Sequence, residues 1–181
     1  MTIVNSVGDL VLTDPQAMRA LADPVRLALL DRLRREGPAT AAELSSTLQA
    51  GGIEGHLEAL ERFGLVARQE SRWSAVAKGF VFEIPDDPEG QAAARKLSSV
   101  MMMNYIDLPQ RWVADDEPRL KLDWARASGL FNARLTVTPD ELRNLQEGLE
   151  RLVEPLITRE ADDVPDDAGR VHILAYFLPE A

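Results

Sequence analysis

Apolar residues recur at helical spacing through the first third of the chain. Two Asp-Pro pairs, at residues 14–15 and 23–24, each place an N-cap residue before a proline that suits the first helical position. They predict a short helix over residues 15–21 and a longer helix over residues 24–36. Gly37 is expected to end the longer helix.

A third and a fourth helix follow. Thr40 and Glu43 have the spacing of a capping box, in which each side chain bonds the amide of the other residue, so they predict a helix to about residue 48. A turn at residues 51–52 comes next. The fourth helix is predicted from apolar residues three or four positions apart, which are Ile53, Leu57, Leu60 and Phe63.

Strand patterns replace the helical pattern after Gly64. Residues 65–68 and 73–78 are typical of the two strands of a hairpin, and residues 69–71 form its polar turn. The extended chain is expected to continue to Pro85. The stretch DDPEG that follows is rich in residues that break regular structure, so we place a domain boundary there.

The second half of the chain predicts helix, strand, helix and strand. A helix begins near Glu89 and is expected to kink or end at Pro109. Residues 131–137 alternate apolar with polar, which predicts a half-buried strand. A second capping box starts the next helix at Thr138, with leucines along one stripe. Residues 171–178 are apolar on both faces, which predicts a central strand of a small sheet.

These elements predict an α+β, helix-rich fold with two domains. Residues 1–85 are expected to form a winged helix-turn-helix domain, because helix, helix, capped helix, turn, helix and hairpin is the order of elements in that fold. Residues 86–181 are expected to form a small α+β domain.

Composition and charge narrow the classes of function. The 181 residues include no cysteine, which excludes disulfides, zinc–thiolate sites and catalytic thiols. The net charge of −10 argues against nucleic acid for the whole chain. However, residues 1–78 carry nine Lys/Arg and ten Asp/Glu, so the acidity lies in the second half. No apolar run could span a membrane and the N-terminus lacks signal-peptide features, so a cytoplasmic protein is expected.

The local sequence resembles the arsenical-repressor-like (ArsR-like) family of bacterial transcription regulators. The resemblance lies in Ala-Asp-Pro-Val-Arg at residues 22–26, His-Leu-Glu-Ala-Leu at residues 56–60 and Gly-Leu-Val at residues 64–66. It covers about residues 16–78, and the rest of the chain is similar to larger members with a C-terminal dimerisation or sensing region. The resemblance implies a homodimer that binds a two-fold operator on double-stranded DNA, with repression as the commoner outcome.

The DNA-binding residues are assigned on this arrangement. Thr40 and nearby amides are expected to meet a phosphate at a helix N-terminus. Gln49, Glu54 and His56 are expected to face the groove or its edge. Three arginines of the fourth helix and the wing are expected to supply charge toward phosphates, namely Arg62, Arg68 and Arg72.

The segment before the fourth helix departs from the family pattern. Gly51, Gly52 and Gly55 stand with Glu54 where base-reading side chains are expected. Three interpretations are open. In the first, Gly51 and Gly52 are simply the turn and Gly55 allows close packing. In the second, the reading surface is weak or absent. In the third, the operator is read mainly through DNA shape.

No catalytic motif and no metal site is predicted. The chain has no G-x-S-x-G, P-loop or G-x-G-x-x-G sequence, so we expect neither an enzyme nor a cofactor. Its only histidines are His56 and His172, and His56 is expected to pack or contact the backbone rather than bind a metal. A methionine-rich segment predicts either a dimer-interface helix or a pocket for a small apolar or aromatic effector, lined by Met101, Met102, Tyr105, Trp112 and Trp124.

The sequence therefore predicts a DNA-binding transcriptional regulator that acts as a homodimer and responds to a small non-metal effector. The alternative is a dimeric interaction module that reuses the winged-helix scaffold, with weak or no sequence-specific DNA binding. The net charge and the glycine-rich segment favour the alternative. DNA binding that weakens clearly with salt would favour the regulator.

Overall fold

The structure is a computed structural model that describes residues 3–5 and 8–180. By contacts the chain divides into two compact units, Met1–Ser128 and Gly129–Ala181. The predicted boundary between residues 85 and 86 lies inside the first unit, and it stays a prediction about the division of function. The N-terminal stretch assessed for signal-peptide features lies only partly within the described residues.

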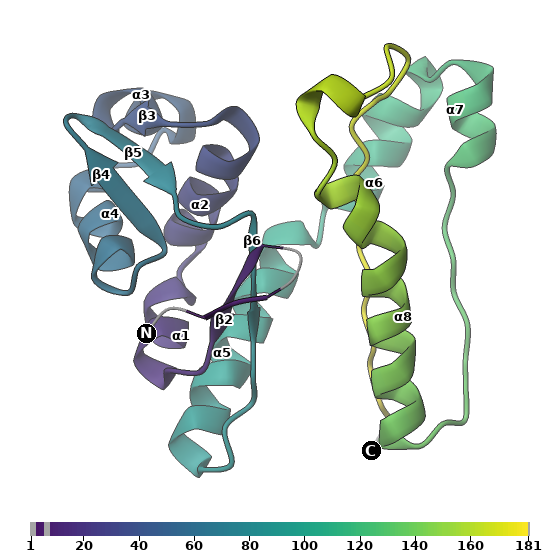
Figure 1. The fold of residues 1–181 in the computed structure, drawn as a ribbon, viewed down its shortest axis with the longest axis horizontal. Helices are drawn as coiled ribbons and strands as arrows, with labels where there is room; N and C mark the ends of the chain where they lie inside the picture. The colour runs from purple at the N-terminus through teal and green to yellow at the C-terminus, as the bar shows by residue number, and fades with distance from the viewer. Residues whose placement is uncertain (1–2, 6–7, 181) are drawn as a thin grey trace. The chain divides into compact units, whose positions relative to one another are not determined.

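Four helices and a hairpin form the predicted winged helix-turn-helix (Figure 1). Asp14 and Asp23 cap the first two helices by accepting from amides of the first turn, as their spacing predicts. The hairpin joins a third short strand in a sheet of order β3-β5-β4. The elements are α1 (Pro15–Leu21), α2 (Pro24–Glu36), β3 (Ala39–Thr40), α3 (Ala41–Leu48), α4 (Ile53–Arg62), β4 (Val66–Gln69) and β5 (Arg72–Ala75).

One hydrophobic core joins these helices to the hairpin. Trp73 on β5 is 1% exposed and is the largest of the fully buried side chains among the described residues. It belongs to the same core as Leu29 and Leu33 of α2, and β5 packs against α2. The hairpin, which forms the wing, is therefore fixed to the helices by apolar packing.

A second small sheet lies beside the winged helix. It has the order β1-β2-β6 and is built from β1 (Ile3–Val4), β2 (Asp9–Leu12) and β6 (Gly79–Phe82). Strand β2 pairs in parallel with β6, and it was not predicted from the sequence. The reason is that the short apolar run of β2 becomes a strand only through a partner about seventy residues later, which no local pattern indicates.

Helix α5 (Pro88–Tyr105) packs against α1 and α2, and Arg19 Nη2 lies 2.7 Å from Glu89 Oε1. It ends before Pro109, which instead lies in the first turn of α6 (Leu108–Arg111), where a proline is tolerated. The remaining helices are η1 (Trp112–Asp116), η2 (Glu117–Arg119), α7 (Leu122–Ala127), α8 (Pro139–Ile157) and η3 (Ala161–Asp163).

The two strands predicted in the second half are not formed by this chain alone. Residues 131–137 and 171–178 run as extended chain, but neither segment joins a β-ladder within the described residues. Residues 131–137 are exposed rather than half-buried, and Phe131 is 93% exposed. Alternating apolar residues favour a strand, but a strand also needs a hydrogen-bonded neighbour, and sequence alone does not reveal whether the same chain supplies one.

Candidate nucleic-acid interface

The N-terminus of α3 is capped by its own side chains. Thr40 Oγ1 accepts from the amide of Glu43 at 3.2 Å, and Glu43 Oε2 accepts from the amide of Thr40 at 2.7 Å. The backbone hydrogen bond with Thr40, helped by the Thr40 side chain, holds the pKa of Glu43 below its ordinary value. A carboxylate thus occupies the helix end where Thr40 is predicted to meet a phosphate, so a phosphate there must compete with Glu43.

Helix α4 buries one face and exposes an acidic one. Ile53, Leu57 and Leu60 point into the core. The exposed positions carry three carboxylates and one guanidinium, from Glu54, Glu58, Glu61 and Arg62. DNA phosphates repel such a face, whereas the amino group of cytosine in the major groove suits a carboxylate acceptor.

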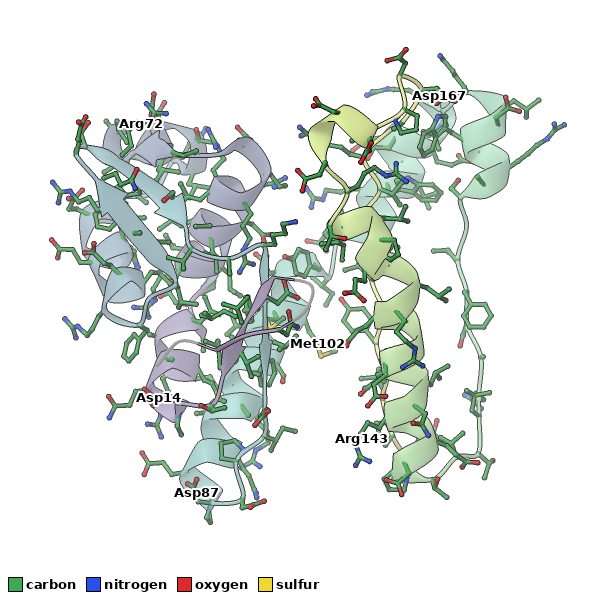
Figure 2. All side chains as sticks on the ribbon, in the orientation of Figure 1. Asp14, Arg72, Asp87, Met102, Arg143 and Asp167 are labelled. Carbon is green, nitrogen blue, oxygen red and sulfur yellow. The ribbon has the colours of Figure 1, made fainter. Side chains whose placement is uncertain are left out.

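Both arginines of the wing are held by carboxylates of the helices. Arg68 Nη1 lies 3.2 Å from Glu54 Oε1, and its guanidinium lies 5.4 Å from the centre of the Trp73 ring. Arg72, labelled in Figure 2, donates to the carbonyl oxygen of Pro38, and its Nη1 lies 3.7 Å from Glu43 Oε2. All four charged side chains are about half exposed. Exposed ion pairs of this kind contribute about 1 kcal/mol or less to stability, so DNA phosphates can displace the carboxylates from the arginines.

Gln49 and His56 differ in accessibility. Gln49 ends α3 in the left-handed conformation and is exposed. The His56 side chain is 28% exposed, and its Nδ1 lies 3.9 Å from Oδ1 of Asp23, the residue that caps α2. His56 therefore lies against the N-terminus of α2, which agrees with its predicted packing role.

The glycines of this segment play different parts. Gly52 has a φ of +70° and is the N-cap of α4, so the turn requires its conformational freedom. Gly55 is exposed, and a Cβ built there would meet nothing within 4 Å. The interpretation that Gly55 allows close packing is therefore wrong, because there is no neighbour for it to approach.

Sequence reasoning named Glu54 but missed that it begins an acidic face. Glu58 follows Glu54 by four residues and Glu61 follows Glu58 by three, a spacing that places all three carboxylates on one side of a helix. The signal was present once α4 had been predicted. It became visible only when the buried positions of α4 showed which side is exposed.

A hollow of about 180 Å³ lies between α2, α5 and the β2–β6 sheet. Met101 and Tyr105 line it, together with Arg34 and Phe80. Met102, Trp112 and Trp124, which were predicted with them, are not among its lining residues, and Met102 is 43% exposed.

Charged and aromatic groups meet at this hollow. The Tyr105 hydroxyl donates to Asp31 Oδ2 at 2.7 Å, and burial together with this bond raises the pKa of Tyr105. The guanidinium of Arg34 lies 5.2 Å from the centre of the Phe80 ring. Burial lowers the pKa of Arg34. Arg34 Nε is buried and has no hydrogen-bond partner within the described part of the chain.

A family model described as a helix-turn-helix domain matches residues 21–69, from the end of α1 through β4. No curated protein matches the chain. The family match supports a winged helix-turn-helix regulator, and with it DNA binding and transcription regulation. It does not separate the ArsR-like family from other families with this domain. Such domains are typically non-enzymatic.

Two further findings concern the described residues only. No helix among them is long and apolar enough to cross a membrane. No three of their His, Asp or Glu side chains form a group that could hold a metal ion.

Replacing Gly55 and Gly52 by alanine should have opposite effects on stability. Gly55→Ala is expected to stabilise the protein by up to about 1 kcal/mol, because alanine favours an exposed helix position. Gly52→Ala is expected to destabilise it by about 1–2 kcal/mol, because an L side chain is strained at positive φ. Denaturant unfolding of both variants measures the difference. Equal effects of the two substitutions would contradict the positive φ of Gly52 in the turn.

Tyr105→Phe should change how stability depends on alkaline pH. The pKa of Tyr105 is raised in the folded chain, so its stabilising contribution is full below the unfolded value of 10.0 and is lost as pH rises above it. We expect Tyr105→Phe to lower the free energy of unfolding by about 1 kcal/mol near neutral pH. On alkalinisation the variant should lose less stability than the native chain. Denaturant unfolding at about pH 8 and pH 11 measures both quantities. Tyr176→Phe, at a half-exposed site, is the control and should leave the native pH dependence unchanged.

Proposed function

We propose that the chain is a transcriptional repressor that binds a two-fold operator as a homodimer and responds to a small non-metal effector. The observation that supports this most is the arrangement of α2, α3, α4 and the wing on one core, within the span of the helix-turn-helix match. That arrangement presents α4 and the wing together, as groove and backbone contacts require.

Contact with DNA would use an exchange of ion-pair partners. Arg68 and Arg72 leave Glu54 and Glu43 for phosphates, and Arg62 adds a third cation from the end of α4. The released Glu54 then accepts a hydrogen bond from a cytosine amino group in the major groove. Because α4 exposes more carboxylates than cations, DNA shape carries part of the specificity.

The hollow beside α5 is the proposed effector site. Its volume of about 180 Å³ is below the several hundred Å³ typical of pockets for drug-sized ligands, so it suits a molecule of about one aromatic ring. Phe80 and Met101 offer apolar contact, and Arg34 adds a charged lining residue.

One observation favours the alternative function. The acidic face of α4 repels phosphates and would suit a basic protein surface. In that case the winged helix serves as a dimeric interaction module, and its arginines remain paired with the carboxylates of α3 and α4.

Fluorescence anisotropy with fragments of the chain's own promoter region tests the regulator. With three arginines per protomer at phosphates, the logarithm of affinity should fall against the logarithm of salt concentration with a slope of about −5 for a dimer. Arg68→Ala should weaken binding and flatten the slope by about 2, because it acts in both protomers. Glu58→Gln should strengthen binding by removing a repulsive carboxylate.

Arg143→Ala is the matched control, because Arg143 is exposed on α8, away from the winged helix in the sequence, and should leave the slope unchanged. No binding of these fragments at about 50 mM salt, with and without the aromatic probes below, would overturn the regulator and favour the interaction module.

Thermal melting in the presence of phenol or indole tests the effector site. Either probe should raise the melting temperature if it occupies the hollow, because binding to the native state stabilises it. Met101→Trp should fill the hollow and abolish the shift. Met102→Trp, at the exposed neighbouring position, should preserve the shift. Equal responses of both variants would place the probe elsewhere.

A further inference from the structure

The second compact unit has no core of its own. None of its described residues is buried, and the most C-terminal buried residue described in the chain is Leu97. Thirteen large hydrophobic side chains among the described residues of this unit are exposed. At roughly 100 Å² each they present about 1,300 Å² of apolar surface, more than a monomer usually exposes in a patch and enough for one side of a stable interface.

Helix α8 supplies one part of this surface. Its capping box is formed as predicted, with Thr138 and Glu141 bonding each other's amides, so the helix is well specified locally. Its leucine stripe nevertheless remains largely uncovered, since Leu145 is 45%, Leu152 75% and Leu156 60% exposed. The other two leucines of the stripe, Leu142 and Leu149, are half-buried. An apolar stripe on an amphipathic helix is expected to pack against another element.

Two extended segments supply the other part. Residues 131–137 lead into α8, and residues 171–178 follow it. Figure 1 shows that both segments run antiparallel to α8. Neither segment joins a β-ladder within the described residues, although both have strand-like sequences. Their exposed apolar side chains include Leu135 at 62% and Ile173 at 59%. Strands without a ladder and with apolar faces need a partner edge.

We propose that this partner is the same unit of a second copy of the chain, and that the two copies form one intermolecular β-sheet covered by the leucine stripes of their α8 helices. Residues 171–178, apolar on both faces, lie inside this sheet, and residues 131–137 lie nearer its edge. A second copy offers the same ladder edges and the same apolar area, so a two-fold arrangement satisfies both copies at once.

The charge of this unit opposes self-association, so apolar contact must drive it. The unit carries five Lys/Arg and eleven Asp/Glu, a net charge of −6. Two such units repel each other electrostatically, so added salt should strengthen the dimer. It should weaken binding to DNA, and the two associations therefore respond to salt in opposite directions.

The inference adds to the proposed function by naming the surface that makes the homodimer. Its test contains no DNA, so the two proposals fail separately. A dimer that binds no operator would overturn only the regulator. A chain that binds the operator while remaining monomeric in its absence would overturn only the inference.

Analytical ultracentrifugation of the full chain measures the assembly. At micromolar concentration the native chain is expected to sediment as a dimer, with twice the 20.0 kDa mass of one chain. Leu152→Glu should raise the dimer dissociation constant at least about 100-fold, because the lost burial counts in both copies. Asn144→Glu is the matched control, since it adds the same charge on the polar face of α8 and should change the constant by less than about threefold.

Hydrogen exchange locates the interface. Amides of residues 131–137 and 171–178 should be protected in the native dimer and exchange rapidly in Leu152→Glu at a concentration where it is monomeric. Ile173→Pro should also impair dimerisation, because proline cannot donate to a β-ladder. A native chain that sediments as a monomer, or a dimer in which both segments exchange as open chain, would overturn the inference.

Discussion

Burial of Trp73 in the core beside α2 is the interaction on which the wing and the proposed DNA-binding surface depend. Trp73 anchors β5, and its hairpin partner β4 is anchored in the same core by Val66, so the wing takes its position from these two side chains. That position brings Arg68 to Glu54 and Arg72 to Glu43. The ring of Trp73 also lies close to the guanidinium of Arg68, so one residue supports both the packing and the charge arrangement of the wing.

The charges at this surface are nearly balanced against one another. Each wing arginine faces a carboxylate from a different helix, and the face of α4 adds Glu58 and Glu61. A phosphate that approaches must replace existing pairs rather than fill an empty basic site. Exposed ion pairs are weak, so this exchange is energetically accessible, but it leaves carboxylates near the DNA. Under the proposed function, this balance favours modest affinity for DNA, with discrimination through hydrogen bonding by Glu54 and through DNA shape.

The two compact units differ in what stabilises them. The first unit has a continuous core that includes leucines of every helix from α1 to α5. The second unit has well-capped helix ends and a regular leucine stripe but no buried residue among those described. The capping box and the regular spacing of leucines specify its helix locally. The burial that would order its extended segments must come from outside the unit.

The sequence by itself determined the helices of the winged domain, the hairpin and both capping boxes, because caps, prolines and apolar periodicity are local. Only the tertiary structure decided which face of α4 is exposed, that the wing arginines meet carboxylates of α3 and α4, and that Gly55 has no neighbour to approach. The pairing of β2 with β6, and the lack of a ladder for residues 131–137 and 171–178, were likewise decided there. The physical reason is that a β-ladder and an ion pair join residues distant in sequence, and neither leaves a local pattern.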